Sequence, residues 1–396
     1  MANPAPEVDA ADPVGVSLVR GDAAWRLQRA IGVIPAKGLG IGRRAILLAI
    51  LTWAPIAVWA WLNHRITGQE TPEPLLSHYG ITVRCLVAIP LMVIAEGLVN
   101  TIMPRIIPYF LTSGVVPASE AGRFHEILAG IARLRDNTLP WIFILGIAIA
   151  LPISTGSLEG THEMDWARDA GATVGFGGKW FLYFVRPVFL AMLLGWIWRL
   201  VLFAVLLRRL ARLHFSLVPS HPDGNGGLGF LDGLPIMFAP IVLALSAIVA
   251  SFWAHQITHH GAKLLELRVP MIAFLVIIVV LFLAPFFFLM GPLMKAKRVA
   301  VLQYGTLSGE HGRMLRERWI EGKDVPDEKG LLGAPEMGPV ADHISMFQMV
   351  EKMRAIPIGK RAVISVLVPA AIPLLIVVSL QVPIKEILLG LLKAVA

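Results

Sequence analysis

Long apolar stretches, separated by short charged segments, dominate the pattern of hydrophobic and polar positions. The longest of them, residues 269–294, contains no ionisable side chain. A hydrocarbon core about 30 Å thick needs roughly 20 apolar helical residues to cross it. The pattern therefore predicts an all-α fold, a polytopic bundle of about seven transmembrane helices with cytoplasmic amphipathic helices. The predicted spans are residues 45–62, 85–103, 139–153, 180–207, 234–254, 270–293 and 362–382.

The composition supports a lipid environment. Hydrophobic residues make up 56% of the chain and charged residues 16%, whereas soluble domains carry about 25% charged residues. The net charge of +8 is explained by basic residues on loops that contact anionic lipid headgroups. No groove-reading motif accompanies it, so we expect no nucleic-acid partner. The single cysteine, Cys85, excludes an intramolecular disulfide and a thiolate metal cluster.

The distribution of basic residues predicts the orientation. Lys and Arg collect in alternate loops, whereas residues 154–179 carry mostly acidic side chains. The positive-inside rule then places the N-terminus in the cytoplasm and the C-terminus in the periplasm of a bacterial inner membrane. The basic residues on the predicted cytoplasmic side include Arg105, Arg123, Arg133, Arg135, Arg208, Arg209, Arg212, Lys295, Lys297, Arg298, Lys360 and Arg361.

The same pattern divides the chain into four parts. Residues 1–43 are predicted as a cytoplasmic tail, disordered over 1–21, with a surface helix over 22–34 that Asp22 caps. Residues 44–294 form a six-span membrane domain, in which 117–135 are amphipathic. Residues 295–361 form a cytoplasmic helical loop with room for a protein partner. Residues 362–396 supply the seventh span and a short tail.

Two opposite charges lie inside predicted spans at similar depth. If Arg105 and Arg208 mark the cytoplasmic boundary, Glu96 and Arg199 each lie about 14 Å from it. We predict that they pair, because an unpaired charge there is costly. Asn100, one turn beyond Glu96, is a candidate to hydrogen-bond the same cluster. The pair either fixes helix packing or takes part in transport or coupling.

A glycine-rich loop follows the fourth span. It contains the formal pattern G-x-G-x-x-G, but no strand precedes it and no βαβ unit surrounds it, so a dinucleotide site is not expected. The alternatives are a backbone nest for an anion or headgroup phosphate, and a tight turn whose next turn Asp223 caps. The residues concerned are His221, Asp223, Gly224, Gly226, Gly227 and Gly229.

Histidines gather at the opposite end of the fifth span. His255 and His259 stand at positions i and i+4, which share a helix face and can hold a metal ion. Three interpretations remain open, namely a metal site, a pH sensor and ordinary interfacial histidines without a metal. No H-E-x-x-H, P-loop or Ser/His/Asp arrangement accompanies them, and we expect no cofactor.

Three segments resemble an uncharacterised family of bacterial multi-spanning inner-membrane proteins. They are residues 221–231 (HPDGNGGLGFL), 304–319 (YGTLSGEHGRMLRERW) and 331–358 (LLGAPEMGPVADHISMFQMVEKMRAIPI). The resemblance implies an inner-membrane location and carries no activity or catalytic residue with it.

These observations favour one class of function over two others. A non-enzymatic scaffold, sensor or accessory subunit agrees best with the missing catalytic arrangement, the missing internal repeat and the sizeable cytoplasmic loop. The alternative is a transporter or channel that uses Glu96 and Arg199. An enzyme is the least favoured class, because only the histidines and the glycine loop would serve it.

Overall fold

The chain folds as an all-α integral membrane protein. The computed structural model describes residues 17–35, 38–67, 74–155, 166–167, 174–323 and 338–382. Within these ranges seven helical segments are long and apolar enough to cross a membrane, which confirms the predicted fold class. The acidic Glu159, Glu163 and Asp165, together with most of the linker between residues 321 and 339, lie outside the described ranges.

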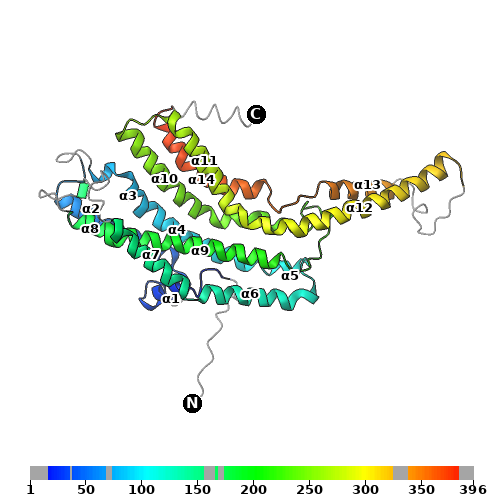
Figure 1. The fold of residues 1–396 in the computed structure, drawn as a ribbon, viewed down its shortest axis with the longest axis horizontal. Coiled ribbons are helices and arrows are strands. Elements are labelled where there is room, and N and C mark those ends of the chain that lie inside the picture. Colours follow the sequence, from blue (N-terminus) through cyan, green and yellow to red (C-terminus); the bar gives the residue numbers. More distant parts are fainter. Residues whose placement is uncertain are drawn as a thin grey trace, which may run out of the picture.

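Most of the spanning helices begin or end a few residues away from the bounds of the predicted span. The helices at the seven spans are α2 (Ile41–Leu62), α4 (Ile89–Ile106), α7 (Leu139–Thr155), α9 (Arg186–Leu210), α10 (Ala239–His259), α11 (Leu264–Leu283) and α14 (Lys360–Ser379). The remaining α-helices are α1 (Ala23–Ala30), α3 (Tyr79–Val83), α5 (Tyr109–Thr112), α6 (Ala121–Asp136), α8 (Phe176–Trp180), α12 (Met290–Leu315) and α13 (Gly338–Glu351). Figure 1 shows them as an elongated molecule.

Two spans contain a π-helical turn just before a proline. The turn Arg84–Ala88 joins α3 to α4, which carries Pro90 in its first turn. The turn Phe181–Val185 joins α8 to α9, which carries Pro187 in the same place. Proline lacks the N–H that would bond the carbonyl four residues earlier, so both helices are altered next to it. Spans two and four therefore share the same local irregularity.

The proline in α2 is accommodated by another helix. Pro55 leaves the carbonyl oxygen of Leu51 without its usual partner within the helix. The indole Nε1–H of Trp180, in α8, donates to that oxygen at 3.2 Å. Prolines are tolerated in membrane helices where a neighbour satisfies the freed carbonyl. This hydrogen bond joins spans one and four.

Helices α4 and α9 extend beyond the ends of α2 and α7. A Cβ atom on Gly97 of α4 would collide with Ile41, the first residue of α2. A Cβ atom on Gly195 of α9 would lie 2.8 Å from Trp141, near the start of α7. The projecting halves of α4 and α9 pack with α5 and α6. Helix α12 extends from this end of the molecule, which we call the arm end.

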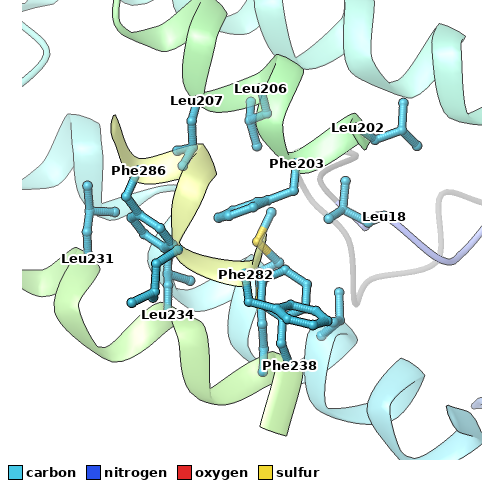
Figure 2. Close-up of a cluster of buried hydrophobic side chains, with 14 of the residues drawn as sticks. Leu18, Leu202, Phe203, Leu206, Leu207, Leu231, Leu234, Phe238, Phe282 and Phe286 are labelled. Atoms are coloured by element: carbon cyan, nitrogen blue, oxygen red, sulfur yellow. The ribbon is translucent and has the colours of Figure 1, made fainter. Parts of the chain in front are cut away.

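The core of the arm end is apolar and rich in phenylalanine. Figure 2 shows Phe203 beside Phe238, Phe282 and Phe286, and its ring centroid is 5.5 Å from that of Phe238 and 5.6 Å from that of Phe286. The predicted amphipathic helix over residues 117–135 is confirmed as α6. Its buried side chains include Phe124, Leu128 and Ile131.

Helices α12 and α13 form a hairpin that extends beyond the bundle (Figure 1). We call this hairpin the arm. Its base is tied by Lys297 Nζ, which donates to the carbonyl oxygen of Met353 at 2.7 Å. Val350 and Met353 are fully buried at this base. A short 3-10 segment, Ala284–Leu289, lies inside the sixth apolar run, so α11 ends before the run does and α12 begins at Met290.

The segment before α1 differs from the sequence prediction. Residues 1–21 are predicted as a disordered tail, yet Ser17, Leu18 and Val19 are buried against the core of the arm end. Figure 2 shows Leu18 near Leu202 of α9. The prediction is wrong for residues 17–21, where two apolar residues and a capping aspartate follow a stretch rich in Ala, Pro and Asp, whereas residues 1–16 lie outside the described ranges. Asp22 does cap α1, since its Oδ1 accepts a hydrogen bond from the N–H of Trp25 at 2.7 Å.

Candidate functional site

Four charged side chains form a buried network between α2, α4, α9 and the cap of α1. Glu96 Oε1 accepts from Arg199 Nη1 at 2.8 Å, and Glu96 Oε2 accepts from Arg44 Nη2 at 2.7 Å. Arg199 Nη2 also donates to Asp22 Oδ2 at 2.9 Å. Two carboxylates thus face two guanidinium groups, and the formal charges cancel. We call these four residues the charge network.

The charge network is closed to solvent. Asp22 and Arg44 are each 1% exposed, Arg199 is 4% exposed and Glu96 is 5% exposed. Burial of this kind requires pairing, because an isolated charge in an apolar medium is very costly. The guanidinium of Arg199 also lies over the ring of Trp196, 5.2 Å from its centroid. The geometry is that of a fixed, neutral cluster.

Donors outnumber acceptors in the charge network. The four carboxylate oxygens of Glu96 and Asp22 each accept one hydrogen bond. Among the described residues, no acceptor is found for Nε and Nη1 of Arg44 or for Nε of Arg199. A buried N–H without a partner costs free energy. The network therefore favours one arrangement of the helices. Well-packed apolar side chains of similar volume often give a more stable protein than buried ion pairs do.

The charge network lies level with the beginnings of α2 and α7. Glu96 is adjacent to Gly97, which packs against the first residue of α2, and Arg199 lies one turn beyond Gly195, which packs against Trp141. The depth of about 14 Å from a boundary at Arg105 and Arg208 stays a prediction, because it is measured from the membrane.

Asn100 hydrogen-bonds the N-terminal segment, and among the described residues no hydrogen bond joins it to Glu96. Its Oδ1 accepts a hydrogen bond from Ser17 Oγ at 3.1 Å. The carbonyl oxygen of Ser17 accepts from Nη1 of Arg135, and Arg135 Nε pairs with Asp136 Oδ1 at 2.8 Å. Residues 17–22 therefore connect α4, α6 and α9 around the charge network.

The glycine loop is organised by Asp223. Its Oδ1 accepts from the N–H groups of Asn225, at 2.7 Å, and Gly227, at 3.2 Å, and its Oδ2 accepts from the N–H of Gly229 at 2.7 Å. These are the amides that an anion nest would offer, and the chain's own carboxylate occupies them. The geometry is that of the glycine-dependent turn with Asp223 capping the turn that follows.

Backbone conformation explains the glycines of this loop. Gly224, Gly226 and Gly227 all have positive φ, at 65°, 64° and 97°, a region that residues with a Cβ rarely enter. At Gly229 a Cβ would lie 2.6 Å from the Cβ of Asp223. His221 Nδ1 lies 3.0 Å from Asp223 Oδ1.

The loop hydrogen bonds change the acidity of Asp223. Partial burial is the largest single influence and raises its pKa. The N–H groups of Asn225, Gly229 and Gly227, together with His221, outweigh burial and lower the pKa of Asp223 below its ordinary value of 3.8. The carboxylate is therefore held in its charged form.

The histidines at the opposite end of the bundle line a cavity. His255 is stacked on His78 with ring centroids 5.4 Å apart, and it lies 4.7 Å from His259. The cavity measures about 570 Å³, and its polar lining residues are His78, Arg84, Ser251, His255, Gln256 and His260. Within the described part of the chain, no group of three or more His, Cys, Asp or Glu side chains is arranged to hold a metal ion.

Sequence reasoning missed two members of the charge network. Arg44 reads as one of a pair of boundary arginines before the first span, and Asp22 reads only as a helix cap. A signal was present for Asp22, because apolar Leu18 and Val19 precede it and favour docking over exposure. For Arg44 the sequence offers no signal that separates it from Arg43.

Comparisons with known proteins identify no relative of this chain. No protein family, no curated protein and no solved structure matches this chain. The arguments about function that follow therefore depend on the geometry of the chain itself.

Proposed function

We propose that this integral membrane protein is a non-enzymatic scaffold, sensor or accessory subunit that docks a partner protein on its arm. The observation that carries the proposal is the arm itself, which stands outside the bundle (Figure 1). Its two helices pack on each other and leave large apolar side chains exposed. Leu302 is 72% exposed, and Val299, Ile344 and Met349 are each more than 40% exposed. Apolar side chains gathered on a projecting element are typical of interaction sites.

The chemistry of the arm specifies the kind of partner. Basic side chains accompany the exposed apolar ones on α12, and Lys295, Arg298 and Arg313 are exposed. A complementary surface therefore combines an apolar patch with carboxylates. Because α12 is 26 residues long, it reaches about 39 Å, which is far enough to meet a partner well away from the bundle.

The charge network supports a structural role over a transport pathway. A transported ion or proton needs a group that changes partner or protonation state, whereas here each carboxylate oxygen accepts a hydrogen bond inside a neutral, closed cluster. The network joins α2, α4 and α9 to the N-terminal segment. In the proposed scaffold it holds the helices rigid beneath the arm.

The location of the arm follows from the positive-inside rule and is part of the proposal. The basic residues at the arm end face the cytoplasm in a bacterial inner membrane, so the N-terminus is cytoplasmic and the C-terminus is periplasmic. The resemblance to uncharacterised bacterial inner-membrane proteins agrees with this location. The cytoplasmic loop over residues 295–361 is then the region that meets the partner.

A site-specific crosslinking experiment tests the proposal. A photoreactive amino acid is placed at position 302 on the arm and, as a control, at position 265, where Leu265 is 86% exposed on α11. In cells of the native host we expect one dominant crosslinked protein from position 302 and none of that protein from position 265. The crosslink should disappear in Ile344→Asp, while the thermal stability of that variant stays unchanged because Ile344 is exposed.

Two results would contradict the proposal. The first is the same diffuse crosslinking from positions 302 and 265. The second is solute or proton flux in liposomes that Glu96→Gln abolishes while the variant remains folded, which would establish the transporter or channel alternative.

A further inference from the structure

A second cavity lies at the arm end, where the chain leaves the arm and enters α14. It measures about 780 Å³, and three basic residues, Arg354, Lys360 and Arg361, line it. All three are exposed. The described residues place no carboxylate within ion-pair distance of these three cations. The cavity is therefore electropositive.

The one carboxylate on the wall of this cavity is already engaged. Asp232 Oδ1 accepts hydrogen bonds from the backbone N–H of Gly359 and from that of Ala362, the latter at 3.3 Å. Asp232 thus caps the start of α14. Arg354 Nη2 also donates to the carbonyl oxygen of Asp223, at 3.5 Å. Among the described residues no side-chain hydrogen bond engages Lys360 or Arg361, so these two cations are available to a ligand from outside the chain.

An apolar stripe begins at the same cavity and follows α14 along the bundle. Ile358, Val363 and Ile364 are the apolar side chains of the lining. From Ile364 the exposed apolar side chains continue at a spacing of four residues through Val368 and Ile372, which are 55%, 47% and 47% exposed. Residues four apart lie on one helix face. A cationic cavity thus continues directly into an apolar strip on a membrane-spanning helix.

We propose that this cavity binds the phosphate of an anionic phospholipid, with Arg354, Lys360 and Arg361 around the headgroup and the acyl chains along Ile364, Val368 and Ile372. Guanidinium and ammonium groups are the side chains that bind phosphate oxygens. Basic pockets at the ends of membrane helices bind such headgroups. The apolar strip selects a lipid over a water-soluble phosphate.

Bound lipid would also act on the arm. The backbone N–H of Arg354 donates to the carbonyl oxygen of Gly224 at 2.8 Å, which joins the base of the arm to the glycine loop. A phosphate held by Arg354 and Arg361 therefore connects α14 to the segment that carries α13. Lipid binding stabilises the join between the arm and the bundle.

The test uses the purified full-length chain. Binding is measured in lipid nanodiscs and by native mass spectrometry, with phosphatidylglycerol or cardiolipin as the anionic probe and phosphatidylcholine as the zwitterionic probe. We expect retention of anionic lipid, with a loss of about fivefold in affinity for each cation removed in Lys360→Gln and Arg361→Gln. Arg43→Gln, which removes an exposed arginine at the start of α2, is the matched control and should bind as the wild type does.

The other outcomes are equally decisive. Inorganic phosphate that stabilises the chain as much as lipid does, with the same dependence on Arg361, would support the phosphate site and assign it to a soluble phosphate compound. Equal retention of phosphatidylcholine, or equal loss of binding in Arg43→Gln and Arg361→Gln, would overturn the proposal. Thermal unfolding of each variant without added lipid shows that the fold is unchanged.

Discussion

Asp22 and Arg199 lie 2.9 Å apart through Oδ2 and Nη2, although 177 positions separate them in the chain. The same aspartate caps α1 through its other oxygen. One short side chain therefore ends a helix and neutralises a buried arginine of the fourth span. The N-terminal segment is thereby part of the bundle.

The dual role of Asp22 can be separated by two substitutions. Asp22→Asn keeps a capping oxygen and removes the charge that faces Arg199, so we expect a loss of about 1.5–3 kcal/mol, the value of a hydrogen bond to a charged group. Asp22→Ala also removes the cap and should cost about 1 kcal/mol more. Chemical unfolding in mild detergent measures both values. Glu126→Gln, on an exposed glutamate of α6, is the control, and an Asp22→Asn variant as stable as that control would contradict this account.

The balance of charge in the network predicts a rescue. Glu96→Leu leaves Arg44 without its carboxylate and deprives Arg199 of one of two, so we expect a loss of about 3–5 kcal/mol. Adding Arg44→Leu removes the stranded arginine and leaves the pair of Asp22 and Arg199 neutral. The double variant should recover most of the loss, because its apolar side chains need no acceptor.

Thermal melting of the two single variants and the double variant measures this coupling. Arg44→Leu alone should be less stable than the double variant, since it leaves Glu96 with a single cation. If the losses of the two single variants add up in the double variant, Arg44 and Glu96 act independently. This result would contradict a stabilising hydrogen bond between them.

The contact between Trp180 and Leu51 predicts an interaction with Pro55. Trp180→Phe removes the donor to the carbonyl that Pro55 frees, so it should destabilise the chain by about 1 kcal/mol. In a Pro55→Ala background, the alanine N–H can bond Leu51 within α2, and Trp180→Phe should then cost little. A double-mutant cycle measures the difference as the coupling energy. A coupling of zero would mean that the indole hydrogen bond contributes nothing.

The glycine loop predicts a pH effect with a definite sign. The pKa of Asp223 is lower in the folded chain than its ordinary 3.8, so folding favours the charged form. Its contribution to the free energy of unfolding is present above pH 3.8 and is lost as pH falls through the lower folded value. Asp223→Asn, which offers one acceptor oxygen in place of two, should be less stable at neutral pH.

Melting temperatures recorded from neutral pH to below pH 3.8 test this sign. The gap between wild type and Asp223→Asn should narrow as the acid is added. A constant gap would show that the three amide hydrogen bonds do not depend on the charge of Asp223.

Hydropathy predicts the seven spans because the signal is local. A run of apolar residues such as 270–293 must be buried in lipid or protein wherever its ends lie. The ends are less predictable, because α4 and α9 continue as helices after the apolar pattern gives way to Arg105 and Arg208.

The charge network shows the same limit. Glu96 and Arg199 stand out in the sequence because each interrupts an apolar run. Arg44 lies at the edge of such a run, where charged residues are ordinary, and only the folded chain shows that it is buried. Leu18 and Val19 favour docking of the segment before Asp22, but they do not identify the partner of its carboxylate. The pairing of Asp22 with Arg199 depends on contacts distant in sequence, and no local pattern predicts it.

The two π-turns described above have a consequence for how this chain tolerates change in length. A π-turn accommodates one residue more than the α-turn it replaces, and each residue rotates an α-helix by about 100°. Deleting one residue from 84–88 would therefore let the π-turn close to an α-turn and leave Glu96 directed at both arginines, and a deletion within 181–185 would leave Arg199 in place in the same way. The same deletion in the α-helical part between either π-turn and the charge network would rotate the downstream residues by about 100°, so it should be far more damaging.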